Sequence, residues 1–107
     1  MNYDIIIVGA GPGGIFSAYE LLKKNEQLKI AVFEAGVPLK DRHCPIDGKK
    51  VKSCIKCKTC AIMNGFGGAG AFSDGKYNIT NDFGGTLYEY IGKDQALELM
   101  RYVDDIN

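Results

Sequence analysis

The sequence predicts an α/β fold that opens with a strand, a helix and a second strand, and three features near its start predict this order. Residues 3–8 form a short apolar run rich in β-branched side chains, which is typical of a strand buried on both faces. The next apolar residues recur at helical spacing, and the basic pair before Asn25 closes that pattern. A second apolar run, residues 30–33, ends at the acidic residue Glu34.

The first strand leads into a Gly-x-Gly-x-x-Gly turn, a pattern typical of Rossmann-like folds that bind a dinucleotide. Gly9 permits the tight turn, and a side chain at Gly11 would keep the backbone away from the pyrophosphate. Gly14 lets the helix pack closely against the strand. Free N–H groups at the helix N-terminus attract the pyrophosphate. The residues of this turn that we expect to contact the dinucleotide are Gly9, Gly11, Pro12, Gly13 and Gly14.

Glu34 and the adjacent Ala35 complete the expected site at the end of the second strand. Glu34 follows Gly14 by 20 residues, a spacing at which an acid accepts hydrogen bonds from the ribose hydroxyls. An acid here also disfavours a 2′-phosphate and so argues against NADP. The spacing alone leaves FAD and NAD open, but a fingerprint at the N-terminus favours FAD. The reason is that many flavoenzymes with two dinucleotide domains begin with the one for FAD.

Residues 37–62 show neither helical nor strand periodicity and form an insertion rich in cysteine and lysine, longer than an ordinary connection of this fold class. The four cysteines of the chain all lie in it: Cys44, Cys54, Cys57 and Cys60. Three closely spaced thiolates plus a remote one suit a [4Fe–4S] cluster better than zinc, whose structural sites usually take two separated pairs. Zinc, a thiol–disulfide pair and unliganded thiols stay open, as does His43 in place of Cys44.

The charge distribution is uneven although the formal net charge is zero. Residues 40–58 hold six lysines and Arg42 against two acids. This basic block is short and lacks interleaved aromatic residues, so we expect a solvated loop and no nucleic-acid partner. No apolar run approaches the roughly 20 residues of a membrane helix, and the acidic start does not resemble a signal peptide. We therefore expect a cytoplasmic protein with no membrane partner.

A glycine-rich loop occupies residues 63–82, and a packing helix is expected over residues 94–107, with Asp94 as its N-cap. Five glycines in residues 65–75 give a backbone that can lie flat against a ligand. Two phenylalanines among them argue against a flexible linker. The residues of this loop that we expect to approach a flavin are Gly67, Gly68, Ala69, Gly70, Ser73 and Asp74. No catalytic acid or base can be assigned.

Three segments, residues 7–14, the Cys54/Cys57/Cys60 run and residues 67–76, together resemble the N-terminal portion of the uncharacterised FAD-dependent dehydrogenases. These are also called NAD(FAD)-utilising dehydrogenases, within the glutathione-reductase-like superfamily. The resemblance runs across nearly the whole chain. It implies that the first glycine turn and Glu34 bind the ADP half of FAD, and that residues 67–74 approach the flavin.

The resemblance further implies an oxidoreductase that acts on a small-molecule substrate, with NAD(P)H as a redox partner of the parent protein. Such flavoproteins contact FAD a second time late in the chain, through a motif that this sequence lacks. We therefore expect residues 1–107 to be an incomplete FAD-binding domain whose partner is the remainder of the flavoprotein chain. Two other functions stay open: a small module that binds NAD or ADP-ribose and holds structural zinc, and a fragment of a flavin-dependent RNA-modifying enzyme.

Overall fold

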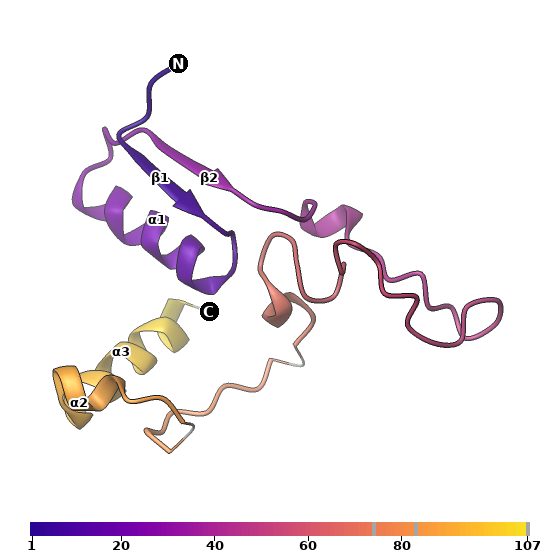
Figure 1. The fold of residues 1–107 in the computed structure, drawn as a ribbon. Helices are drawn as coiled ribbons and strands as arrows, with labels where there is room; N and C mark the ends of the chain where they lie inside the picture. Colours follow the sequence, from indigo (N-terminus) through magenta and orange to yellow (C-terminus); the bar gives the residue numbers. More distant parts are fainter. Residues whose placement is uncertain (74, 83, 107) are drawn as a thin grey trace. The chain divides into compact units, whose positions relative to one another are not determined.

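The computed structural model describes residues 1–73, 75–82 and 84–106, and the chain forms two compact units, residues 1–73 and 74–107. The first unit holds the secondary-structure elements β1 (Ile5–Val8), α1 (Pro12–Lys24) and β2 (Ile30–Phe33), followed by two 3-10 turns, Leu39–Asp41 and Ala69–Phe72. The second unit holds α2 (Leu87–Ile91) and α3 (Lys93–Ile106) (Figure 1). The predicted α/β class and its opening βαβ unit are confirmed.

The two strands of the first unit pair in parallel, with Ile5 opposite Ile30 and Val8 opposite Phe33. Parallel neighbours need a crossover connection, and α1 supplies it. The helix ends at Lys24, and Asn25 follows as its C-cap and donates its backbone N–H to the Leu21 carbonyl. This end agrees with the one predicted from the basic pair before Asn25.

Helix α1 packs on one face of this two-stranded sheet, and Figure 1 shows the helix beside the two strand arrows. Ile5 and Ile7 are half-buried, whereas Ile6 is 62% exposed and Val8 is 87% exposed. The prediction that the first strand is buried on both faces is therefore wrong for the described chain. A parallel strand needs a cover on each face, and the described residues of this unit supply α1 for one face only.

In the second unit, a short helix that the sequence pattern did not reveal precedes the predicted one. Gly92, with φ of 85°, ends α2 and donates its N–H to the Tyr88 carbonyl. The Gly92 carbonyl accepts the N–H of Ala96, so α3 already begins at Lys93. Asp94 consequently lies in the first turn of α3 and is not its N-cap. Among the described residues no helix is both long and apolar enough to cross a membrane.

We expect Gly14→Ala to destabilise the first unit by roughly 1–3 kcal/mol, the usual cost of forcing extra volume into a packed site. A Cβ at position 14 would overlap the carbonyl oxygen of Gly9 and come within 3.3 Å of Ile7 Cγ2. Gly13→Ala is the matched control, because a Cβ there meets nothing within 4 Å and alanine favours the helix. Urea unfolding of both variants measures the difference, and equal midpoints would contradict this packing role.

Candidate functional site

The glycine turn between β1 and α1 leaves backbone donors unpaired at the start of the helix. Gly9 adopts φ of 101°, in the left-handed region, and donates its N–H to the Phe33 carbonyl at 2.6 Å. Gly11 is the N-cap of α1, and within residues 1–73 no side chain caps this helix. The N–H groups of Gly13 and Gly14 therefore have no acceptor from the helix itself. Such an end favours a phosphate group.

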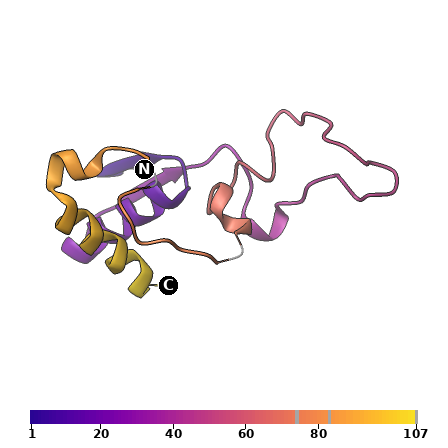
Figure 2. The same ribbon diagram turned by 90° about the horizontal axis from the view of Figure 1, so that it is seen from below.

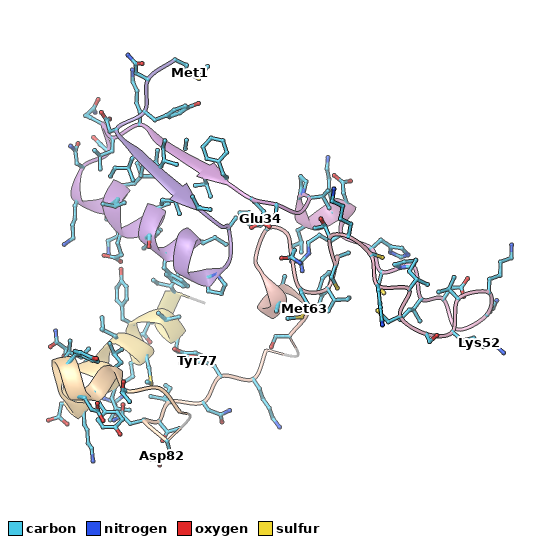
Figure 3. All side chains as sticks on the ribbon, viewed as in Figure 1. Met1, Glu34, Lys52, Met63, Tyr77 and Asp82 are labelled. Atoms are coloured by element: carbon cyan, nitrogen blue, oxygen red, sulfur yellow. The ribbon has the colours of Figure 1, made fainter. Side chains whose placement is uncertain are left out.

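The carboxylate of Glu34 joins three backbone segments at the end of β2, where Figure 3 labels it. Its Oε2 accepts the Ala10 N–H at 2.8 Å, while its Oε1 accepts the N–H groups of Gly36 at 2.9 Å and Gly65 at 3.0 Å. The hydrogen bond from Ala10, followed by that from Gly36, holds the pKa of Glu34 below its ordinary value of 4.5. Desolvation opposes this shift without reversing it.

The carboxylate of Glu34 already serves the backbone of its own unit. The three hydrogen bonds above use three of its four acceptor positions, and the Ala35 N–H is a further backbone donor that lowers its pKa. Because the pKa lies below the ordinary value, the group stays ionised into mild acid, and the ionised form is the stronger acceptor. The predicted role of Glu34 as acceptor for the ribose hydroxyls stays a prediction. Ala35, the next residue, is exposed.

The second glycine-rich loop lies against the first glycine turn. Gly67 donates its N–H to the Ala10 carbonyl at 2.8 Å. A Cβ at Gly68 would lie 3.2 Å from Gly11 Cα and 3.3 Å from Pro12 Cδ, so the two backbones are close enough that a side chain would crowd them. The structure thus brings together three segments that the sequence predicted separately: the turn, the acid and this loop.

The other loop residues that were predicted to approach the flavin follow Gly68 in the sequence. Ala69 and Gly70 lie in the exposed part of a 3-10 turn, and Ser73, which caps its end, donates its N–H to the Gly70 carbonyl at 3.0 Å. Asp74, also expected near the flavin, lies outside the described residues.

A groove of about 550 Å³ opens beside Glu34. Its wall is mostly apolar and includes Ala10, Ile15, Val32, Gly36, Val37 and Phe66. Apolar walls with one well-placed polar group are typical of sites for small organic ligands. A groove of this kind suits an adenosine, whose base is largely apolar on its faces and whose ribose presents hydroxyls to a carboxylate.

Arg42 organises the loop that carries the glycine-rich segment, although the sequence analysis placed it in a solvated basic block. The side chain is only 5% exposed. Its guanidinium donates to four carbonyl oxygens at 2.7–2.9 Å and lies 4.7 Å from the centre of the Phe72 ring. The four carbonyl groups belong to Ala61, Ile62, Phe66 and Gly68.

The expectation of a solvated loop is therefore wrong for Arg42, whereas the lysines of the block are exposed. The physical reason is geometric: a guanidinium presents a rigid fork of five donors, which can bind several carbonyls at once, and an ammonium cannot. The sequence did contain a sign that this residue differs from the rest of the block, because Arg42 is the one arginine beside six lysines.

The four cysteines are free thiols, with Cys44 and Cys60 half-buried and Cys54 and Cys57 exposed. His43, the alternative ligand, is exposed. Over the part of the chain that the structure describes, no three Cys, His, Asp or Glu side chains are already gathered as metal ligands. The predicted metal site stays a prediction on this geometry.

Comparison with known proteins finds a likeness in the first part of the chain. The sequence model of the Thi4 family matches residues 1–40, which contain β1, α1, β2 and Glu34. Thiamine thiazole synthase of Yarrowia lipolytica is 53% identical over 34 residues, which are 32% of this chain and 11% of that protein. Thiamine thiazole synthase of Phaeosphaeria nodorum is also 53% identical over 34 residues, 32% of this chain and 10% of that protein.

The matched segment spans only about a tenth of the length of these two relatives. No solved structure matches the chain significantly. The likeness therefore concerns the βαβ unit and its glycine turn. The resemblance of the later motifs to FAD-dependent dehydrogenases stays a prediction, because the family match ends at residue 40, before the first cysteine.

Glu34→Gln should lower the free energy of unfolding near neutral pH. It should also make that free energy depend less on pH in acid. The folded state prefers ionised Glu34, so this carboxylate contributes stability above its ordinary pKa of 4.5, and the contribution is lost as pH falls through the lowered folded-state pKa. Thermal unfolding from pH 7 to pH 2.5 measures both effects. The two stability curves should converge at the acid end, and parallel curves throughout would contradict the prediction.

Arg42→Lys should destabilise the first unit by roughly 1–3 kcal/mol or more, because buried carbonyl groups lose their donors while the charge is kept. Arg101→Lys makes the same substitution at an exposed position of α3 and serves as the control. Denaturant unfolding, together with hydrogen exchange at Gly65–Gly68, measures the loss. If both variants unfold alike, the guanidinium does not hold this loop.

Proposed function

We propose that residues 1–73 bind the dinucleotide FAD and form the N-terminal FAD-binding part of a flavin-dependent oxidoreductase. The observation that carries this proposal is the convergence of the uncapped turn, Glu34 and the loop at Gly67 and Gly68 beside one apolar groove. Each part matches one chemical portion of a dinucleotide. The match of residues 1–40 to the Thi4 family covers the same segment and supports a nucleotide site.

The residues present fit FAD. The N–H groups of Gly13 and Gly14 would hold the pyrophosphate, which the absence of a side chain at Gly11 lets approach the backbone. The Glu34 carboxylate would also accept a hydrogen bond from a ribose hydroxyl. The loop that begins at Gly67 would lie toward the flavin end. When bound, FAD supplies a ring that accepts a hydride from a substrate, and the protein orients it.

FAD is favoured over NAD because of the second glycine loop. Gly67 donates its N–H to the Ala10 carbonyl and Gly68 packs against Gly11, so this loop adjoins the pyrophosphate region and can contact the ligand beyond the ADP half. The two curated relatives are thiamine thiazole synthases, but their likeness covers only 34 residues. It supports nucleotide binding and says nothing of the reaction that follows.

A titration followed by amide NMR spectra of the ¹⁵N-labelled chain tests the proposal even where binding is weak. ADP should shift the amides of Gly11, Gly13 and Gly14, and FAD should in addition shift those of residues 67–73. NADP should bind less tightly than NAD, because its 2′-phosphate meets the Glu34 carboxylate. Absence of shifts in the glycine turn at millimolar FAD would overturn the proposal, and equal patterns for FAD and ADP would favour a module for ADP-ribose or NAD.

Gly11→Val should weaken FAD binding at least tenfold, which corresponds to about 1.4 kcal/mol, and a urea unfolding curve of the same variant checks that it is still folded. Gly11 has φ of −77°, an ordinary conformation, and a Cβ there meets only the Gly68 Cα at 3.9 Å. The Cβ itself makes an ordinary contact with Gly68, and the valine methyl groups beyond it would occupy space that the pyrophosphate needs. Glu20→Gln on α1 is the control with native affinity. Undiminished FAD affinity in Gly11→Val would exclude the turn as the pyrophosphate site.

A further inference from the structure

The four cysteines of the chain line one small cavity of about 80 Å³ in the loop of residues 43–60. We propose that this loop is a metal-binding lobe in which Cys44, Cys54, Cys57 and Cys60 together hold a thiophilic metal centre. The centre is either an iron–sulfur cluster or a zinc ion, since both are bound by four cysteine thiolates. This site is separate from the proposed FAD site and does not depend on it.

Arg42 joins the two ends of the lobe. Its Nε donates to the Ala61 carbonyl at 2.8 Å, which ties the residue before the lobe to the residue after it. Cys44 and Cys60 flank this hydrogen bond, and both are half-buried. The first and last cysteines, 16 positions apart in sequence, are therefore held at one place by a buried side chain.

Asp47 reverses the chain at the other end of the lobe. Its Oδ1 accepts the N–H groups of Lys49 at 2.8 Å and Val51 at 2.9 Å, and its own N–H donates to the Val51 carbonyl at 3.0 Å. The hydrogen bond from Val51, followed by that from Lys49, lowers the pKa of Asp47. This turn sends the chain back past residues 44–46, so that Cys54 and Cys57 line the same cavity as Cys44. Figures 1 and 2 both show this reversal as the loop drawn in magenta.

The backbone at the central cysteines is arranged to present a sulfur. The Sγ of Cys54 accepts the N–H of Lys56 at 3.4 Å. Lys56 adopts φ of 54°, the left-handed region in which a residue with a side chain is strained, and among the described non-glycine residues it alone does so. The turn at Lys56, between Cys54 and Cys57 in the sequence, therefore holds the Sγ of Cys54 in place.

The charge and composition of the lobe also fit a metal–thiolate centre. It carries five lysines and one aspartate, Asp47, and this positive charge offsets that of four thiolates. It contains no helix or strand, and its two isoleucines, Ile46 and Ile55, remain 43% and 59% exposed. A loop of this length without an apolar core lacks an internal source of stability, which a structural metal supplies in small protein segments.

Metal binding would bring the cysteine side chains into the ligand arrangement, which the described structure does not yet have. The described side chains do not yet form a ligand set of three, although all four cysteines border the cavity. Binding then draws the thiols together, releases their protons and orders the loop. Of the two metal centres, the C-x-x-C-x-x-C run favours the iron–sulfur cluster, because structural zinc usually takes two separated pairs of ligands.

Metal and thiol analysis of the full chain, produced with iron and zinc in the medium and purified without oxygen, tests the proposal. We expect either four iron atoms with four acid-labile sulfides or one zinc per chain, and four thiols that react with Ellman's reagent only after a chelator or acid treatment. The iron form would also show broad absorption near 400 nm. Four freely reactive thiols with no metal after anaerobic reconstitution, or a disulfide within the run, would overturn the proposal.

Single substitutions assign the ligands. Each of the four Cys→Ser variants should lower metal retention at least tenfold, whereas Ser53→Ala, within the same lobe, and His43→Ala should retain the native content. If His43→Ala loses the metal and Cys44→Ser keeps it, the four-cysteine assignment is wrong. Because the metal is counted without added FAD, the result is independent of the nucleotide titration. The amide NMR signals of residues 12–24, which form α1, check that each variant remains folded.

Discussion

The hydrogen bonds of the Glu34 carboxylate hold the first unit together at the place where its site forms. This one side chain accepts N–H groups from Ala10 in the glycine turn, from Gly36 just after β2 and from Gly65 in the distant loop. Each of these donors is a backbone group that would otherwise lie unpaired in a partly buried region. An ionised acceptor forms stronger hydrogen bonds than a neutral one, so the charge of Glu34 serves both the fold and the site.

Arg42 performs the complementary task with the opposite charge. Glu34 gathers backbone donors, whereas Arg42 gathers the backbone acceptors that the same loop presents between Ala61 and Gly68. The loop has no regular secondary structure apart from the 3-10 turn that begins at Ala69, so its carbonyls need partners from elsewhere. The lobe with the cysteines starts and ends at this guanidinium. Glu34 therefore positions the segments of the proposed nucleotide site, and Arg42 positions the two ends of the proposed metal-binding lobe.

Local patterns predicted the parts of the chain whose structure depends on near neighbours. The run of residues 3–8, the helical spacing after Gly14 and the acid at position 34 each act through short-range geometry, and the strands, α1 and its C-terminal end were placed correctly. The exposure of Ile6 and Val8 could not be predicted in this way, because burial of a strand depends on whichever element covers its face. The missed α2 and the early start of α3 are effects of one turn at Gly92, and boundaries of this kind are poorly specified by periodicity.

The sequence by itself determined the βαβ unit and the spacing of Gly9, Gly11, Gly14 and Glu34, because these follow from backbone conformation and from the period of apolar residues. Only the tertiary structure showed that Gly68 packs on Gly11 and that Glu34 bonds to Gly65. It alone also showed that Arg42 is buried. These contacts join residues that lie 19 or more positions apart in the sequence. Such pairings are decided by the satisfaction of buried donors and acceptors across the folded chain, which a local pattern does not encode.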